Sequence, residues 1–197
     1  MNRAIAFFDF DGTITEKDSL LEFIRYVKGD AAFYFGFFIH SPVLILYKLQ
    51  IISNHSAKEI MLRYFFGRMD VEVFKKHCDN FMNEKLPQLL RPKAMHEMKK
   101  MQESGASVVV VSASPENWLK SWCIANGAEC IATRLVISDN KITGKIDGRN
   151  CHGKEKVRRI RSAFDLDKYS SVYAYGDSPG DRHMLSLATI RFYKPFR

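Results

Sequence analysis

The sequence predicts an α/β fold: a doubly wound, mainly parallel sheet that carries an all-helical subdomain inserted near the N-terminus. Short apolar runs that end in polar clusters alternate with segments of helical periodicity. One of these runs, Val108–Val111, is continuously β-branched, as expected of a strand buried on both faces of a parallel sheet. The segment from about 16 to 86 shows only helical periodicity and interrupts the alternation.

The first predicted strand is the apolar run Ile5–Phe8, which Asp9-Phe10-Asp11-Gly12-Thr13 follows at once. Because side chains alternate along a strand, Asp9 and Asp11 would point to the same side if the strand persisted that far. Two adjacent carboxylates repel each other unless a proton or a cation lies between them. The same stretch, taken alone, also fits an acidic turn after a strand.

The inserted segment is predicted to form a series of helices, several of which begin at a residue suited to cap a helix. A helix over 20–27 is expected to end at Gly29. The predicted caps in this segment are Asp18 or Ser19, then Ser56, then Asp70.

Phe33–Leu49 is the most unusual segment by composition, because it is apolar on all sides. A membrane span needs about 20 apolar residues without a break, whereas Pro42 interrupts this segment and Lys48 lies near its end. We therefore expect two short helices joined by a turn. Two interpretations stay open: a pair of buried helices, or a surface that touches a membrane interface or a partner.

The α/β alternation resumes after the insert and continues to the C-terminus. In chain order, the predicted elements are a helix from Pro92, the strand Val108–Val111, a helix from Pro115, a hairpin of strands near 133–137 and 141–146 around Asp139-Asn140, a helix from near His152, the strand Ser171–Tyr175, a helix around Met184 and a last strand within 188–193.

Polar clusters follow three of the predicted strands directly. They are Asp9 with Asp11, Ser112 with Ser114, and Asp177 with Asp181. The carboxyl ends of parallel strands meet at one edge of a sheet, and ligands of such folds bind beyond that edge. The sequence therefore predicts a functional site where these three clusters converge.

Composition adds weaker constraints. The formal net charge of +8 favours anionic partners such as phosphates, nucleic acid or an acidic membrane surface. The four cysteines lack metal-site spacing, so we expect free thiols in a reducing compartment. Asp9 and Asp11 lie where the apolar part of a signal peptide would have to be, so none is expected.

Four motifs in this order resemble the haloacid dehalogenase (HAD) superfamily of aspartate-nucleophile phosphotransferases. They are Phe8-Asp9-Phe10-Asp11-Gly12-Thr13, Val111-Ser112-Ala113-Ser114, Lys154 within Cys151–Val157, and Gly176-Asp177-Ser178-Pro179-Gly180-Asp181. The insert after the first motif is similar to the cap of subfamily IB, the phosphoserine-phosphatase-like branch. The resemblance implies a Rossmann-like catalytic core of residues 1–15 and 87–197 with a C1-type helical cap of residues 16–86.

The same resemblance implies Mg²⁺-dependent hydrolysis of phosphomonoesters through an aspartyl-phosphate intermediate. Asp9 would be the nucleophile and a metal ligand. Asp11 would act as acid and base, and its backbone carbonyl would join the metal ligands together with Asp177. Asp181 would orient a metal-bound water or Lys154. The expected phosphate-binding residues are Gly12, Ser112, Ala113 and Lys154.

Asp11 also separates branches of the superfamily, because dehalogenases lack this second aspartate. P-type ATPases carry a lysine after the nucleophile, where this chain has Phe10. The resemblance therefore favours a phosphatase or a phosphotransferase.

The substrate is expected to be a phosphorylated small molecule that the cap selects. Asp18 or Glu22 would supply a carboxylate and Arg63 an arginine, as in phosphoserine phosphatases. The aromatic-rich segment is similar to a subset of the branch that includes a bacterial phosphatidylglycerophosphate phosphatase, which makes a lipid phosphate at the membrane surface the alternative substrate.

A third alternative is a non-catalytic protein that binds membrane or nucleic acid, suggested by the net charge and the apolar insert. No nucleic-acid partner is expected for the enzyme. We expect a cytoplasmic protein, with contact to the inner face of the membrane through Phe33–Leu49 left open. The sequence does not predict an oligomeric state.

Overall fold

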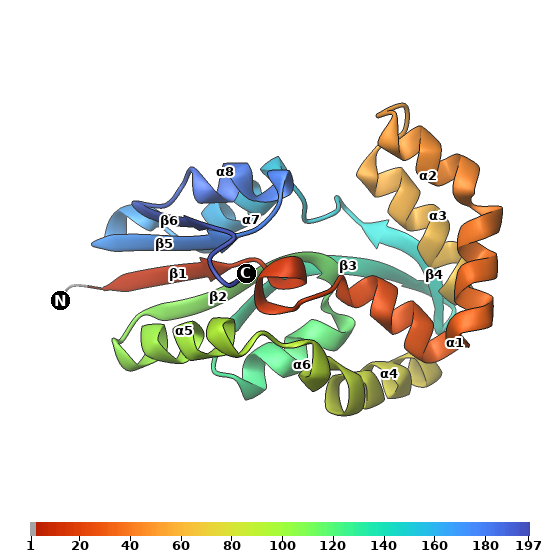
Figure 1. Cartoon of the computed structure of the whole chain (residues 1–197), viewed down its shortest axis with the longest axis horizontal. Coiled ribbons are helices and arrows are strands. Elements are labelled where there is room, and N and C mark those ends of the chain that lie inside the picture. The colour runs from red at the N-terminus through yellow and green to blue at the C-terminus, as the bar shows by residue number, and fades with distance from the viewer. Residues whose placement is uncertain (1–2) are drawn as a thin grey trace.

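The computed structural model describes residues 3–197 and has a six-stranded sheet of order β4-β3-β2-β1-β5-β6 (Figure 1). Neighbouring strands run parallel except β3 and β4, which are antiparallel. The predicted α/β class is therefore confirmed. The strands are β1 (Ala4–Phe8), β2 (Ser107–Pro115), β3 (Glu129–Ser138), β4 (Lys141–Asp147), β5 (Ser171–Gly176) and β6 (Ile190–Tyr193).

Eight α-helices and several short helical turns connect these strands within the described residues. The α-helices are α1 (Ser19–Ile39), α2 (Ser41–Lys48), α3 (Asn54–Phe66), α4 (Val71–Asn80), α5 (Pro92–Glu103), α6 (Glu116–Ala125), α7 (Lys154–Ala163) and α8 (Arg182–Leu185). The short turns are Phe10–Ile14, Phe81–Lys85, Leu86–Leu89, Leu166–Lys168 and Pro179–Asp181.

Strand β1 lies inside the sheet and sends alternate side chains into two hydrophobic clusters. Ile5 and Phe7 join Ile160 of α7 and Met184 of α8 on one face. Phe8 joins the cluster of the other face, which α5 and α6 cover. Figure 1 shows these two helical layers on opposite sides of the sheet. An apolar strand with no polar alternation is stable here because both of its faces are covered.

The register of the parallel strands aligns their carboxyl ends at one edge. Phe8 pairs with Val110 of β2 and with Tyr175 of β5. The amide of Asp9 still donates to the carbonyl of Tyr175 at 2.9 Å. The residues that follow β1 and β5 therefore begin side by side, as the sequence predicted. Ser112 and Ser114 lie within β2, which extends to Pro115, and not after it.

The helices of the insert begin largely where the sequence predicted. Asp18 caps α1 by accepting a hydrogen bond from the Leu21 amide at 3.0 Å, and Asp70 caps α4. Gly29, at a φ of 78°, interrupts α1, which resumes as far as Ile39. The cap predicted at Ser56 is wrong: α3 begins earlier, and Ser53 accepts from the Ser56 amide at 3.0 Å.

The apolar segment forms two helices, with an angle of 60° between α1 and α2. Among residues 3–197, no single helix has the length and apolar character of a membrane span; α1 and α2 meet that criterion only as a bent pair. The interpretation as two buried helices is wrong for α2, because no residue of α2 is buried.

The insert and the sheet share one hydrophobic cluster. Phe23 of α1 stacks on Trp118 of α6 with ring centroids 4.5 Å apart, and Phe66 and Phe74 pack around Phe23. This cluster continues to Phe8 of β1. The division into a core of 1–15 and 87–197 and a cap of 16–86 therefore stays a prediction, since packing is continuous across it.

The β3–β4 hairpin extends from the sheet to the insert. It turns at Asp139-Asn140, where both residues adopt the left-handed conformation (φ of 50° and 58°) that asparagine and aspartate tolerate. At Gly144 of β4, a Cβ atom would lie 2.4 Å from the Arg63 Cα atom, so only glycine allows α3 this close. All four cysteines are free thiols, as predicted.

Candidate active site

A cavity of about 370 Å³ lies at the carboxyl edge of the sheet. The ends of β1 and β5 and Ala113 of β2 meet there. Its lining residues are Asp9, Asp11, Gly12, Asp18, Asn54, Lys58, Ala113, His152, Lys156, Asp177, Ser178 and Asp181. The structure thus brings two of the three predicted clusters into the cavity, Asp9 with Asp11 and Asp177 with Asp181. Of the segment Ser112–Ser114 only Ala113 lines it, and α3 adds Asn54 and Lys58.

Asp9 is buried and is the carboxylate directly at the end of β1. Its Oδ1 atom accepts a hydrogen bond from Lys156 Nζ at 2.5 Å, and its Oδ2 atom accepts one from Thr13 Oγ1 at 3.3 Å. Burial raises the pKa of Asp9 to about 7, whereas the charge of Lys156 acts in the opposite direction. A carboxylate in this position depends on neighbouring positive charge to stay ionised.

Lys156 is a buried cation between two carboxylates. Besides Asp9, its Nζ atom donates to Asp181 Oδ1 at 2.8 Å. Burial alone would lower the pKa of Lys156, but these two carboxylates outweigh it and raise the pKa. Asp181 is fixed in turn, since its Oδ2 atom accepts from the Ser178 amide at 3.0 Å and the Ser178 hydroxyl at 2.7 Å.

The placement of Lys154 in the catalytic cavity is wrong; the lysine of the site is Lys156. Lys154 is the first residue of α7, and its side chain is exposed at the edge of a neighbouring cavity. Lys156 and Ile160 are buried on one face of α7. Positions four apart share a helix face, so Ile160 was the available signal for choosing Lys156.

Asp11 is held by groups from two elements. Its Oδ1 atom accepts from the Ser19 amide at the start of α1 at 2.7 Å. Its Oδ2 atom accepts from the hydroxyls of Ser114 at 2.6 Å and Ser112 at 3.2 Å. Ser112 is fully buried and bonded to Asp11, so its hydroxyl lies behind the cavity, where Ala113 forms the wall. The roles of Ser112 and Ala113 in binding phosphate stay predictions.

The carboxylates of Asp9, Asp177 and Asp181 offer atoms that lie within 4.8 Å of one another. Asp9 and Asp177 of this group are the predicted metal ligands, and Asp181 binds Lys156 and Ser178. Asp177 pairs with Arg197, and burial raises the pKa of Asp177 despite that partner. Two carboxylates whose ionised forms need positive charge fit Mg²⁺, which prefers hard oxygen ligands.

Position 12 requires glycine for two reasons: the backbone conformation there and the proximity of Asp177. Its φ of +82° is disfavoured for other residues, and a Cβ atom would lie 2.5 Å from Asp177 Oδ2. We expect Gly12→Ala to lower kcat/KM for a phosphomonoester by about 100-fold, because displacing Asp177 disturbs the predicted metal ligands. Steady-state kinetics at saturating Mg²⁺ measure this. Gly105→Ala is the control: its φ is +80°, but its surroundings are open and it lines neither this cavity nor its neighbour. Equal losses in the two variants would contradict the expectation.

Three residues of the insert, Asp18, Glu22 and Arg63, were predicted to select the substrate, and of these only Asp18 lines the cavity. Burial, followed by the charge of Asp11, raises the pKa of Asp18. Glu22 lies elsewhere, within 3.6 Å of Lys17 and Arg25 and 4.0 Å of Lys85. Arg63 is exposed, with its backbone against β4. The predictions that Glu22 and Arg63 contact the substrate are therefore wrong, because packing turns their faces of α1 and α3 away from the cavity.

The insert contributes Lys58 and Asn54, which sequence reasoning missed. Lys58 Nζ donates to the carbonyl of Ala113 at 2.9 Å, and burial lowers the pKa of Lys58. Asn54 donates to the Tyr47 hydroxyl at 3.0 Å and accepts from Asn150. The two residues lie four apart on one face of α3. Their spacing was visible in the sequence, but the direction of that face was not.

These features define a class: an α/β protein with a carboxylate-lined cavity at the carboxyl edge of its sheet, where a buried aspartate follows an inner parallel strand. The family model described as "haloacid dehalogenase-like hydrolase" matches residues 6–186. The chain therefore belongs to the haloacid dehalogenase-like hydrolases, and the predicted family is confirmed. As a member of a hydrolase family, the chain is an enzyme rather than a non-catalytic binding protein.

Two curated relatives are similar over most of the chain. Protein CicA of Caulobacter vibrioides is 36% identical over 192 residues, which cover 96% of this chain and 85% of that protein. "Probable phosphatase Rv3661" of Mycobacterium tuberculosis is 29% identical over 202 residues, covering 93% of this chain and 66% of that protein.

Solved structures share the fold at low sequence identity. A protein with unknown function from Bordetella pertussis Tohama I has a TM-score of 0.84 at 20% identity, with 97% of this chain and 89% of that chain covered. A phospho-aspartyl intermediate analogue of phosphoserine phosphatase has a TM-score of 0.70 at 16% identity, with 97% and 86% covered. These similarities support the Rossmann-like sheet with its helices.

Proposed function

We propose that the chain is a Mg²⁺-dependent phosphomonoester hydrolase in which the Asp9 carboxylate is the nucleophile. One observation carries the proposal: the Oδ1 atom of buried Asp9 lies 2.5 Å from the Nζ atom of buried Lys156. Both residues line the same cavity as Asp177. The family is a hydrolase family, a relative is named a probable phosphatase, and solved phosphoserine phosphatases share the fold.

In this proposal, an Asp9 oxygen attacks phosphorus, and the bond from phosphorus to the ester oxygen breaks. Asp11 donates its proton to the departing oxygen, a contribution worth roughly 10²–10⁴-fold. Asp11 then removes a proton from the water that attacks the aspartyl phosphate. The bond from phosphorus to the Asp9 oxygen breaks and phosphate leaves, so Asp9 is a carboxylate and Asp11 is protonated again. Lys156 compensates the negative charge at Asp9 in each step.

The residues proposed to hold Mg²⁺ are Asp9 and Asp177 through their carboxylates and Asp11 through its backbone carbonyl. When bound, Mg²⁺ would offset the charge of the phosphate and of the carboxylate that attacks it. Asp181 supports this arrangement indirectly, because it fixes Lys156 and the start of the Pro179–Asp181 turn.

A panel of phosphorylated metabolites that includes phosphoserine, together with a generic aryl phosphate, tests this function. We expect phosphate release from the aryl phosphate, loss of that release with EDTA, and recovery with added Mg²⁺. Release that EDTA leaves unchanged would contradict the metal requirement. Only one of the carboxylate and arginine candidates for an amino-acid head group, Asp18, lines the cavity, so we expect phosphoserine to be a poor substrate.

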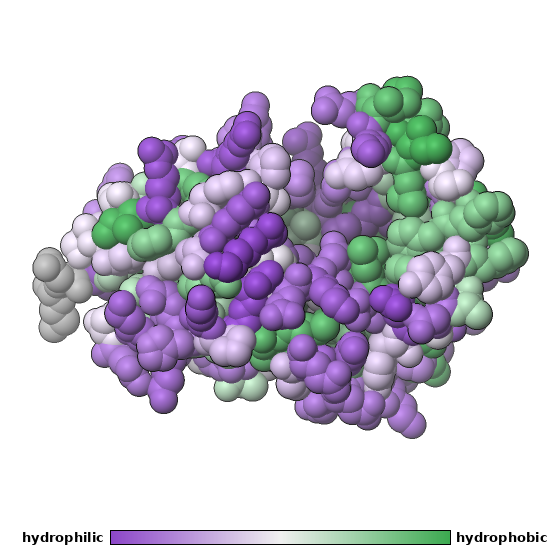
Figure 2. Space-filling view, viewed as in Figure 1, coloured by the Kyte–Doolittle hydropathy of each residue, from purple (hydrophilic) through white to green (hydrophobic). Residues whose placement is uncertain are grey.

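A lipid phosphate at a membrane surface is the second candidate substrate, and an exposed apolar surface favours it. Figure 2 shows apolar side chains gathered over α2. We name this surface the α1–α2 apolar surface; its residues are Tyr34, Phe35, Phe38, Ile39, Ile45, Leu46, Tyr47, Leu49 and Ile51. Phe38 is 77% exposed and Ile51 66%. Residues 31–57 contain Lys48 but no carboxylate, which suits anionic headgroups.

Co-sedimentation with vesicles of phosphatidylglycerol and phosphatidylcholine tests this second candidate. We expect the wild type to sediment with the vesicles and the double variant Phe38→Gln/Ile45→Gln to lose most of that binding, because both side chains are exposed. The double variant should keep its hydrolysis of a soluble aryl phosphate. Wild type that stays in the supernatant at low salt would exclude the membrane as the site of action.

A further inference from the structure

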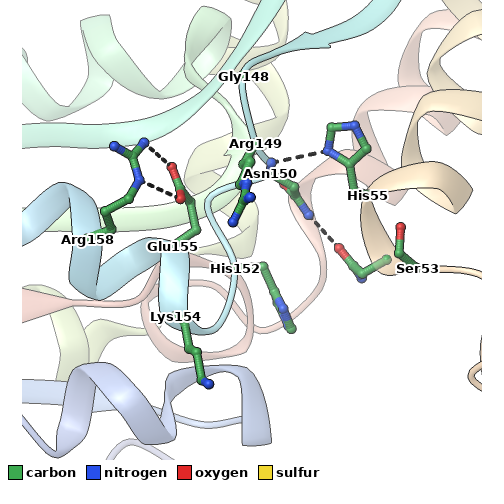
Figure 3. A pocket seen from close by; sticks show the side chains of 10 residues that line it. Ser53, His55, Gly148, Arg149, Asn150, His152, Lys154, Glu155 and Arg158 are labelled. Carbon is green, nitrogen blue, oxygen red and sulfur yellow. Dashed lines mark hydrogen bonds and ion pairs between the residues drawn. The ribbon is translucent and has the colours of Figure 1, made fainter.

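A second cavity of about 620 Å³ lies beside the catalytic cavity (Figure 3). Asn54 and His152 line both cavities, so the two adjoin along these side chains. The proposed chemistry uses no residue that belongs only to the second cavity. A substrate whose phosphate lies against Asp9 could extend past Asn54 and His152 into this space.

The second cavity has an excess of positive charge. Its charged lining residues are Arg149, Lys154, Glu155 and Arg158. Glu155 is already neutralised: Arg158 binds both of its carboxylate oxygens at 2.6 and 2.8 Å, and Arg159 Nε donates to it at 2.9 Å. These bonds hold the pKa of Glu155 at about 2. Within residues 3–197, the side chains of Arg149 and Lys154 have no carboxylate partner.

Two helix N-termini line the same cavity. Ser53, Asn54 and His55 form the start of α3, and Lys154 is the first residue of α7. Helix N-termini present free amides and a positive dipole end, and both favour anions. Two N-termini and two unpaired cations around one space therefore favour the same class of ligand.

The loop that carries Arg149 is fixed before any ligand binds. The neighbouring residue Asn150 is buried. Its side-chain Oδ1 atom accepts from Thr133 Oγ1 at 2.8 Å, and its backbone amide donates to His55 Nδ1 at 3.3 Å. Arg159 donates to the Arg149 carbonyl at 2.6 Å. A cation on a preorganised backbone binds an anion with less loss of conformational entropy than one on a free loop.

We infer that the second cavity binds a second phosphoryl group, carried on the leaving group of the substrate. This inference rests on the proposed function, and it names the substrate class: phosphomonoesters that bear a further phosphate beyond the one that is hydrolysed. Arginine matches phosphate oxygens bidentately, and lysine adds a point charge. A bisphosphate of a small polyol and the headgroup of a phospholipid that carries a terminal phosphate share this chemistry.

Calorimetric titration with phosphonates, which are not hydrolysed, tests the inference. The probes are alkane bisphosphonates with chains of two to six carbons and the matching alkyl monophosphonates, each in the presence of Mg²⁺. Two identical ends alone give a twofold advantage. We expect the best bisphosphonate to bind at least about tenfold tighter than its monophosphonate, since a charge-assisted pair is worth about one decade of affinity.

Arg149→Gln and Lys154→Gln should each reduce this advantage several-fold and leave monophosphonate affinity unchanged. Arg161→Gln is the matched control, because it removes the same charge from the exposed face of α7, away from both cavities.

The two sources of the second phosphate are separated by comparing hydrolysis of a soluble polyol bisphosphate with that of a terminally phosphorylated phospholipid in vesicles.

Equal affinity for the two probes, or an advantage that survives in Arg149→Gln/Lys154→Gln, would overturn the inference. The proposed function is tested separately by aryl phosphate hydrolysis. A protein that hydrolyses the aryl phosphate but shows no bisphosphonate advantage refutes only the second site. A protein that prefers bisphosphonates but hydrolyses no phosphate refutes only the proposed hydrolysis.

Discussion

Asp9→Asn is expected to abolish phosphate release, with kcat/KM lowered by at least about 10⁴-fold. An amide oxygen is a poor nucleophile, and the substitution also removes a negative charge that a metal and Lys156 would both contact. Steady-state assays with an aryl phosphate measure the loss.

Covalent trapping separates loss of the nucleophile from loss of metal binding. Acid-quenched wild type should carry phosphate that hydroxylamine releases, as expected of an acyl phosphate, and Asp9→Asn should carry none. Asp139→Asn is the matched control, because Asp139 is exposed in the β3–β4 turn at a φ that asparagine also adopts. Activity of Asp9→Asn within tenfold of the wild type would refute the nucleophile.

Lys156→Met is expected to cost about 3–5 kcal/mol of unfolding free energy, because it leaves Asp9 and Asp181 buried without their cation. The Lys156 side chain is only 2% exposed, so water cannot replace the lost charge. Urea denaturation in EDTA measures the cost without interference from bound metal. Lys154→Met, at an exposed position two residues away, should change stability by less than about 0.5 kcal/mol.

The cost of Lys156→Met should depend on pH with a definite sign. In the wild type the pKa of Asp9 is already raised from 3.8 to about 7, and losing Lys156 raises it further. A raised folded-state pKa of an acid destabilises the fold above the unfolded-state pKa, to the full extent only above the folded-state value. The variant should therefore differ from the wild type more near pH 8 than near pH 5. A cost that grows as the pH falls would contradict this reasoning.

The sheet was predictable because its strands depend on local pattern. Val108–Val111 and the run before Asp9 are apolar at every position, and the polar clusters mark their ends. The parallel arrangement then brings those ends to one edge. Asp9, Asp11, Asp177 and Asp181 reach the cavity for that reason.

The residues that the sequence misplaced lie on helices, where rotation decides which side chain faces the site. Lys154 and Lys156 belong to the same basic run, and the burial of α7 against the sheet, on the face that also carries Ile160, selects Lys156. Packing of Phe23 against Trp118 sets the rotation of α1 and turns Glu22 away. Lys58 reaches the cavity only because α3 packs on β4, a contact between segments far apart in the chain.

The hydrogen bond from the Ser19 amide to Asp11 links the helical insert to the residues that follow β1. Ser19 is the first residue of α1, so the helices that shape the entrance also position the proposed proton donor. Replacing these helices by those of a relative would replace this amide as well. A chimera built to accept a new substrate should therefore lose turnover as well as gain affinity, until the junction after Asp18 is rebuilt. In the proposed mechanism, the start of α1 therefore couples substrate selection to proton transfer.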